Sequence, residues 1–233
     1  NEDKLNFLGR IHWAGQAAET VRGARAAGFD NISMDLIYGL PFENQTLWEK
    51  DLDRALGMAP SHLSCYMLTI EPGTPLDKKV KQGLITPPGR GRMTALFKNT
   101  VAFLTGAGYE HYEISSFAKG FRNRSRHNAK YWDMKPYYGF GAAAHSYDGK
   151  TRSWNPNSIN RYTGDLDSGR LPVEGREELS KNQKMMEMIM LRLRTLEGLD
   201  HEQFQTQFHH SFYDGYKEIL DPVLDQSLGF FKD

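Results

Sequence analysis

Two stretches of the sequence combine residue types that could bind a ligand. The first, residues 31–41, is an apolar run with one carboxylate, Asp35, and is stopped by Gly39 and Pro41. Such a run is typical of a parallel strand covered on both faces. Because an ionised carboxylate is costly to bury alone, we expect Asp35 to point into the protein toward donors of the protein or of a ligand. A structural Asp that binds nearby backbone N–H groups is the alternative.

The second stretch, residues 126–132, combines hydrogen-bonding and aromatic groups and includes His127, Asn128, Tyr131 and Trp132. An imidazole in such a loop could be an axial ligand for a porphyrin iron. Tyr131 and Trp132 could then stack on the macrocycle. A hydrogen-bonded loop histidine that binds no ligand is the alternative interpretation.

Two further residues are candidates for ligand contacts. Arg10 and Asp35 could hold opposite ends of a ligand that carries both charge types, such as an amino-acid or nucleoside group, unless Arg10 is an ordinary surface residue. His145 follows three alanines and could close over the ring of a ligand, or it could be structural. The remaining histidines show no metal-binding spacing, and neither a nucleophile elbow nor a phosphate loop is present.

The composition narrows the class of protein. Apolar residues make up 39% and charged residues 25% of 233 residues, as in ordinary globular proteins. Because 29 basic residues balance 29 acidic ones, nucleic acid or an acidic membrane is not expected as the main partner. No apolar run approaches the roughly 18 residues of a membrane-spanning helix. The single cysteine, Cys65, excludes an internal disulfide, fits a reducing cytoplasm, and cannot supply a cluster that needs three or more thiolates.

Helical and extended patterns alternate along the first half of the chain. Helices are expected at residues 13–27, 47–58 and 91–105, and strands around Asp35, at 62–70 and at 109–115. This order predicts parallel strands joined by right-handed crossovers, in an open sheet or a barrel. Without a glycine-rich strand-to-helix turn, the dinucleotide-binding sheet is less favoured. In a barrel, ligands bind at the C-terminal ends of the strands, where residues 35–39, 69–73 and 115–119 would meet.

The rest of the chain has other patterns. Residues 1–12 are expected to be a polar lead-in and residues 76–89 a polar surface stretch, and residues 117–165 lack helical periodicity. From about residue 176 helical patterns return. We therefore expect residues 1–170 to form part of a barrel with an aromatic loop region, and residues 171–233 to form a small, incomplete helical domain. Because the chain starts without Met and stops soon after an apolar tetrapeptide, we expect it to be part of a longer protein.

Several motifs resemble one family in the same order. The sequence Asp-Leu-Ile-Tyr-Gly-Leu-Pro at residues 35–41 is similar to the oxygen-independent coproporphyrinogen III oxidase family of radical S-adenosylmethionine (SAM) proteins. The resemblance continues through residues 66–75, 108–115, 125–132 and 138–142. The H-N-x-x-Y-W form at residues 127–132 resembles the heme-chaperone branch of that family.

The resemblance implies a fold and a set of cofactors. The fold would be a partial (β/α) barrel that carries a [4Fe-4S] cluster and SAM, followed by a small helical domain. Arg10 and Asp35 match positions that bind SAM, Thr69 matches a backbone contact on the next strand, and His145 matches a contact to a second SAM. His127 matches the histidine implicated in heme binding, in one motif with Asn128, Tyr131 and Trp132.

The resemblance also implies an activity. The whole protein would be a cytoplasmic heme chaperone that delivers heme to heme-accepting proteins. The alternative is an oxidase that converts coproporphyrinogen III to protoporphyrinogen IX. The C-x-x-x-C-x-x-C cluster ligands of the family lie upstream and are not in this chain. We therefore expect the chain by itself to hold no cluster and to catalyse no radical chemistry.

Overall fold

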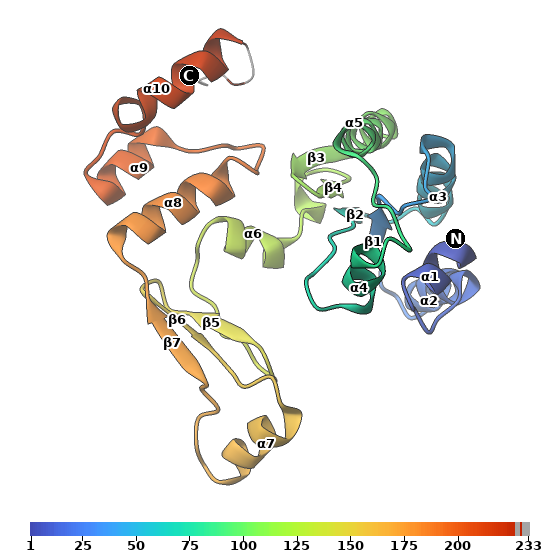
Figure 1. The fold of residues 1–233 in the computed structure, drawn as a ribbon, viewed down its shortest axis with the longest axis horizontal. Helices are drawn as coiled ribbons and strands as arrows, with labels where there is room; N and C mark the ends of the chain where they lie inside the picture. Colours follow the sequence, from blue (N-terminus) through green and yellow to red (C-terminus); the bar gives the residue numbers. More distant parts are fainter. Residues whose placement is uncertain (227–228, 230–233) are drawn as a thin grey trace. The chain divides into compact units, whose positions relative to one another are not determined.

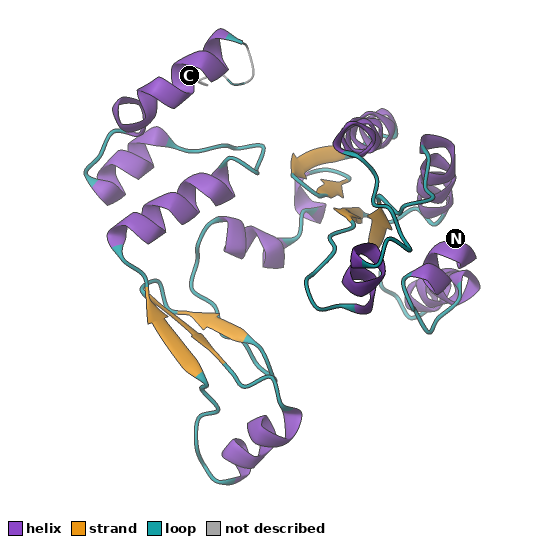
Figure 2. Ribbon diagram, in the orientation of Figure 1, coloured by secondary structure: helices purple, strands orange, loops and turns teal. Residues whose placement is uncertain are grey.

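The computed structural model describes residues 1–226 and residue 229. It divides into two units, Asn1–Ser125 and Arg126–Asp233, each described separately below. The first unit is built around a four-stranded sheet with the strand order β1-β2-β4-β3 (Figures 1 and 2). Its strands are β1 (Ser33–Tyr38), β2 (His62–Met67), β3 (Glu110–Glu113) and β4 (Ser116–Ala118). As predicted, β1 and β2 pair in parallel, and Asp35 lies opposite Ser64.

The helices of the first unit alternate with its strands along the chain, as the sequence predicts. The helices are α1 (Glu2–Phe7), α2 (Ala14–Ala26), α3 (Gln45–Gly57), α4 (Pro75–Lys81) and α5 (Arg90–Gly106). The helices expected at residues 13–27, 47–58 and 91–105 are confirmed. Side-chain caps define some of their ends: the Asn44 side chain accepts a hydrogen bond from Leu47 N at the start of α3.

Two short helices form in stretches where the sequence predicts none. The lead-in predicted for residues 1–12 is wrong, because α1 forms there. Residues 76–89 form a polar surface stretch, as predicted, and it includes helix α4, which begins with Thr74 as its cap and Pro75 in its first turn. Helices of one or two turns carry too few apolar residues for a periodic stripe, so only their caps mark them in the sequence.

The third strand differs from the prediction. Both β2 and β3 pair antiparallel with β4, so β3 runs in the direction of β2 but is separated from it by β4. Residues 115–119, expected at the C-terminal end of a strand, instead form β4 and its flanks. The chain reverses tightly here, and Ser115 N donates to the Glu113 carboxylate over 3.1 Å. A return strand of three residues is too short to show alternation in the sequence.

The core of the first unit lies between the sheet and its helices. It contains Trp48 and Leu52 from α3, Leu96 from α5, and Leu63 from β2. On β1, Met34, Leu36 and Tyr38 pack with this core, which confirms the predicted alternation. Ser33 and Asp35 therefore lie on the other face of the strand, where both are exposed.

The described residues of the second unit form a three-stranded antiparallel sheet, β5-β6-β7, and five helices (Figure 2). The strands are β5 (His145–Tyr147), β6 (Thr151–Trp154) and β7 (Gly175–Glu178). The helices are α6 (Arg126–Trp132), α7 (Ile159–Asp167), α8 (Lys181–Arg192), α9 (His201–Phe208) and α10 (Phe212–Asp225). The expectation of no helix within residues 117–165 is wrong at α6 and α7, whose polar and aromatic residues mask the helical period.

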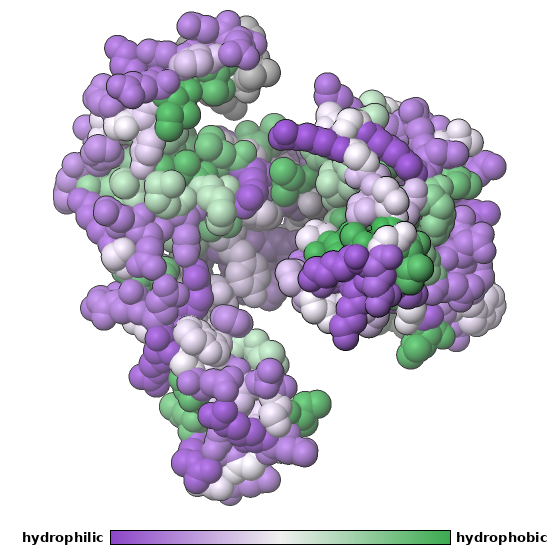
Figure 3. Space-filling model, viewed as in Figure 1, coloured by the Kyte–Doolittle hydropathy of each residue, from purple (hydrophilic) through white to green (hydrophobic). Residues whose placement is uncertain are grey.

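Aromatic residues of α9 and α10 pack against α8 in the core of the second unit. Phe204, Phe208 and Phe212 surround Met188. The methionine-rich stripe of α8 therefore belongs in part to the core, as expected. Met185 and Ile189 also pack against this core, whereas Met186 and Met190 are exposed, and Figure 3 shows apolar colours along α8. The domain boundary expected between residues 170 and 171 lies in the connection from α7 to β7. No helix in the described part of the chain is long and apolar enough to cross a membrane.

Candidate functional site

A cavity beside β1 brings two of the predicted ligand-binding residues together. Its volume is about 460 Å³, within the range of small-molecule sites, and Arg10 and Asp35 both line it. Apolar side chains of Met34, Ile37 and Tyr66 also line it. The cavity therefore offers both charge types and an apolar wall, as a zwitterionic nucleoside ligand requires.

The side chain of Asp35 is not buried, contrary to the prediction. It is exposed, and among the described residues no hydrogen bond or ion pair holds it. The physical reason is that the core packs against the opposite face of β1, which carries Met34, Leu36 and Tyr38, and leaves the face of Asp35 open. The alternative of a structural Asp bound to backbone N–H groups is not observed either. Asp35 can therefore bind a ligand without losing a contact within the protein.

Arg10 also lines a second cavity, of about 580 Å³, together with Thr69. Thr69 is exposed and lies just after β2. Leu8 also lines both cavities. Arg10 and Leu8 are therefore shared by the cavity that contains Asp35 and the cavity that contains Thr69. Within the described chain no ion pair joins Arg10 to Asp35, and both charges are available to a ligand.

A buried charge cluster supports the end of β1 and was missed by the sequence analysis. Lys4 forms ion pairs with Glu43 and with Asp51, the latter over 2.5 Å, and its ammonium lies 5.2 Å from the Trp48 ring centroid. Burial lowers the pKa of Lys4, and a hydrogen bond and charge attraction from Asp51 oppose that shift. These residues lie far apart in the sequence, so no local pattern indicates their contact.

Glu43 fixes the turn that follows β1. Its carboxylate is fully buried and accepts hydrogen bonds from Gly39 N over 2.5 Å and from Leu40 N over 3.3 Å. Gly39 has φ of +86°, which favours glycine. A Cβ built on Gly39 would lie 2.4 Å from Met93 Cε, so a larger residue would also meet that side chain. Lys4, Glu43 and Gly39 thus position the strand that carries Asp35.

His62 on β2 links three strands through hydrogen bonds. Its Nδ1 lies 2.7 Å from Ser33 Oγ, and its Nε2 lies 2.7 Å from Tyr112 OH. Tyr112 OH also accepts a hydrogen bond from Ser125 N over 3.1 Å. Burial lowers the pKa of His62, while the charge of Asp35 opposes the shift. Both ring nitrogens are engaged, so His62 is a structural residue and not a metal ligand.

In the second unit, α6 carries the other predicted site. His127 is exposed, and its Nε2 lies 3.3 Å from Tyr131 OH, with the ring centroids 5.1 Å apart. Residues i and i+4 of a helix lie on one face, which explains the pairing. Tyr131 in turn packs edge-on against Tyr137 at 4.7 Å. Asn128 is half-buried on the same helix.

Trp132 lies at a different place on α6 from the His127–Tyr131 pair. It contributes to the lining of a cavity of about 390 Å³, together with Asp133, Met134 and Arg192. The structure therefore brings His127 and Tyr131 together and places Trp132 at a neighbouring surface of the same helix. His145 is exposed on β5, where its ring lies 5.9 Å from that of Trp154.

The residues that the structure describes do not suit a metal cluster. Among the described residues, no group of three His, Cys, Asp or Glu side chains could hold a metal ion. Burial raises the pKa of the Cys65 thiol to about 12, and the charge of Asp35 adds to the shift. Because metals bind the thiolate, Cys65 is not a suitable cluster ligand.

Comparison with known proteins places the chain in a family. Residues 179–228 match the model of the HemN C-terminal domain. Heme chaperone HemW of Lactococcus lactis is 32% identical and matches 98% of this chain and 59% of its own length. Heme chaperone HemW of Escherichia coli is 31% identical over 98% of this chain and 58% of its own. The chain belongs to the HemN-like family of radical SAM proteins.

Other members of this family support the assignment. A zebrafish relative, named radical S-adenosyl methionine domain-containing protein 1, mitochondrial, is 30% identical over 88% of this chain and 48% of its own. The solved structure of the HemN coproporphyrinogen III oxidase from Escherichia coli, described as a radical SAM enzyme, matches with a TM-score of 0.74. That match is 20% identical, covers 97% of this chain and 55% of the other, and shows the fold. The expected fold class is confirmed, although the described residues form no closed barrel.

The chain spans about 60% of the length of the HemW relatives from L. lactis and E. coli. The segment that it shares with these HemN-like proteins includes the cavity of Asp35 and helix α6.

Proposed function

We propose that this chain is part of a heme chaperone, which binds heme and delivers it to heme-accepting proteins. The observation that carries the proposal is the exposed imidazole of His127, one helical turn from the phenol of Tyr131. Imidazole is a common axial ligand of heme iron, and aromatic rings pack on the macrocycle. The name of the HemW relatives supports the same activity.

An exposed iron ligand suits delivery better than storage. Because His127 lies on the surface of its unit, an acceptor protein can approach heme held there without unfolding of the chaperone. Asn128, Tyr131 and Trp132 would complete the heme contacts. We place this activity in the cytoplasm, with hemoproteins as partners.

We also propose that the cavity beside β1 binds part of SAM. The free guanidinium of Arg10 suits the carboxylate of SAM, and Asp35 suits its ammonium or ribose hydroxyl groups. Thr69 would contribute from the adjoining cavity, and His145 would contact a second SAM. The [4Fe-4S] cluster of the family requires cysteines that this chain does not contain, so no step is assigned to it here.

The test is a heme titration of the full-length protein, followed at the Soret band. Replacement H127A should weaken heme binding at least about tenfold, because a coordinate bond is lost. The matched control is H201A, which removes another exposed histidine of the same unit, on α9, and should leave the titration unchanged. Equal affinities for H127A and the unsubstituted protein would contradict the proposal. So would clear formation of a decarboxylated tetrapyrrole from coproporphyrinogen III in an anaerobic assay.

A further inference from the structure

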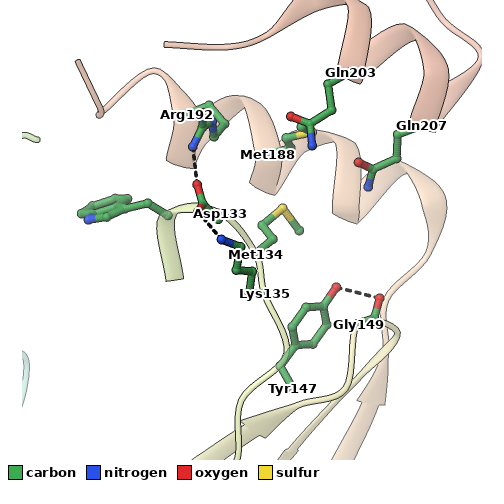
Figure 4. A pocket seen from close by; sticks show the side chains of 10 residues that line it. Asp133, Met134, Lys135, Tyr147, Gly149, Met188, Arg192, Gln203 and Gln207 are labelled. Carbon is green, nitrogen blue, oxygen red and sulfur yellow. Dashed lines mark hydrogen bonds and ion pairs between the residues drawn. The ribbon is translucent and has the colours of Figure 1, made fainter. Parts of the chain in front are cut away.

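The cavity beside Trp132 in the second unit has the chemistry of an anion site. Its charged lining residues are Asp133, Lys135 and Arg192, so two cations face one carboxylate. Gln203 and Gln207 extend into it from α9 (Figure 4). The cavity therefore presents hydrogen-bond donors and one excess positive charge, all from residues of one unit.

Two buried donors at this cavity have no acceptor. Nε of Arg192 and Nε1 of Trp132 are both buried, and neither has a hydrogen-bond partner among the described residues. Buried N–H groups in folded proteins are almost always paired. The orphaned Nε of Arg192, a residue that lines the cavity, therefore indicates a ligand that supplies acceptor oxygens.

Asp133 binds only some of the N–H donors that Arg192 and Lys135 offer. Its Oδ1 lies 2.5 Å from Nη1 of Arg192, and its Oδ2 lies 3.0 Å from Nζ of Lys135 (Figure 4). The Arg192 side chain is 16% exposed, whereas that of Lys135 is 63% exposed. Because a guanidinium has five N–H donors, Arg192 can bind a second carboxylate while it keeps Asp133. Lys135 extends into solvent and adds only a diffuse charge.

The apolar part of the lining limits the class of ligand. Met134, Met188 and Tyr147 form the walls between the polar groups. Tyr147 OH donates to Gly149 O over 2.9 Å, so its hydroxyl is already paired and its ring is the surface offered. An aliphatic carboxylate, with a short hydrocarbon arm and a charged end, suits this combination better than a fully polar anion.

We propose that this cavity holds a carboxylate arm of the tetrapyrrole, with Arg192 as its main contact. The proposal rests on the proposed function, because it takes heme bound at His127 as the source of the carboxylate. His127 and Trp132 belong to one helix and lie about 7.5 Å apart along its axis at 1.5 Å per residue. Iron ligation is thus assigned to the start of α6, and carboxylate binding to the cavity beside its end.

The test compares two ligands that differ only in the carboxylates. Heme and heme dimethyl ester are titrated into the full-length protein at the Soret band. The unsubstituted protein should bind heme about tenfold more tightly than the ester, as expected for hydrogen bonds to a charged group. Replacement R192Q should remove most of that preference and leave ester binding unchanged, whereas H127A should weaken both ligands.

Two further variants separate a specific contact from a change of fold. Replacement D133N should increase the preference for heme, because it removes the carboxylate that competes for Arg192. Replacement R170Q breaks another Arg–Asp pair of the same unit, away from the cavity, and should change neither titration. Far-ultraviolet circular dichroism checks that each variant is folded.

The outcomes are distinguishable. Heme binding with the same heme-to-ester ratio in R192Q and the unsubstituted protein would overturn this assignment and leave the proposed function standing. Loss of ester binding in R192Q would show a general defect and would also overturn it. Absence of heme binding by the unsubstituted protein would overturn the proposed function and this assignment together.

Discussion

The hydroxyl of Tyr131 lies 3.3 Å from Nε2 of His127 on the exposed surface of α6. When this hydroxyl donates to Nε2, it engages the lone pair that an iron ion would need. Tyr131 is itself held by its edge-on contact with Tyr137. The imidazole proposed to bind heme is therefore partly occupied by its own neighbour, which would favour release of the ligand.

Replacement Y131F should strengthen heme binding about two- to fivefold. The change removes the competing hydroxyl, and an exposed hydrogen bond contributes about 0.5–1 kcal/mol. The phenyl ring keeps the packing with Tyr137 and any contact with the macrocycle. Heme titration and the rate of heme transfer to an acceptor such as apomyoglobin measure the effect, and transfer should slow.

Replacement Y138F is the matched control for Y131F. Tyr138 is a largely exposed tyrosine of the same unit, and its substitution should alter neither affinity nor transfer rate. Weaker heme binding by Y131F would show instead that the hydroxyl supports His127 as a ligand, by accepting the N–H of Nε2.

Replacement E43Q should lower the free energy of unfolding by about 3 kcal/mol, because it removes one partner of a buried ion pair. Glu43 is fully buried and pairs with Lys4, while its other oxygen binds the backbone at Gly39. Lys4 keeps Asp51, which limits the loss. Urea denaturation measures the change. Because the turn after β1 loses a support, SAM affinity of the full-length protein should fall as well.

An exposed ion pair provides the comparison for E43Q. Glu174 pairs with Arg161 over 2.7 Å with both side chains largely open to water, and E174Q should leave the urea midpoint unchanged. If E43Q proves as harmless as E174Q, the buried cluster does not stabilise the end of β1.

The sequence predicts elements whose residues repeat with a clear period. Helices α2, α3 and α5 and strands β1 and β2 are long enough to show an apolar stripe or run, and all five are found near their expected bounds. The short elements α1, α4 and β4 have no such signal. Helix α6 is hidden because its seven residues include only one aliphatic side chain, that of Ala129.

The residues of the candidate sites, too, can be predicted only where the local sequence carries a signal. The charges and the resemblance predict Arg10 and Asp35 as a pair, and both residues line one cavity. The exposure of Asp35 could not be predicted, since it depends on whether one or both faces of β1 are covered. Contacts between Lys4 and Glu43, or between Arg192 and Asp133, join distant residues and have no trace in a single sequence.

The free energy of unfolding should fall as the pH rises above about 9, in part because of Cys65. Burial raises the pKa of its thiol from 9.0 to about 12 in the folded chain. Between these pH values the unfolded thiol loses its proton while the folded one keeps it, so rising pH favours unfolding. One such group contributes a slope of up to about 1.4 kcal/mol per pH unit. Urea denaturation at several pH values measures the slope.

Replacement C65A isolates this contribution. Its stability should depend less on pH than that of the unsubstituted chain between pH 9 and 10, before unfolded tyrosines ionise near 10.0. Tyr38, whose pKa burial also raises to about 12, adds a similar dependence above pH 10 in both proteins. Parallel stability curves for the two proteins from pH 9 to 10 would show that Cys65 ionises as readily in the folded chain as in the unfolded one.

Replacement G39A should lower the free energy of unfolding by about 1–2 kcal/mol. Gly39 has φ of +86°, and an L-residue in the left-handed region costs about that much. The added Cβ would also meet Met93 Cε at 2.4 Å, although that flexible side chain can move. The double replacement G39A/M93A removes the steric contact but not the backbone strain. The part of the lost unfolding free energy that comes from the left-handed backbone should therefore remain in the double variant.

Replacement G23A is the control for G39A, because Gly23 lies inside α2 and a Cβ added there would meet no atom within 4 Å. Alanine favours a helix interior over glycine, so G23A should stabilise the chain by up to about 1 kcal/mol. The two Gly→Ala changes are thus expected to have opposite signs in the same urea experiment. If G39A also stabilised the chain, the turn after β1 would not require the left-handed conformation, and Glu43 would not hold the strand end in the way proposed.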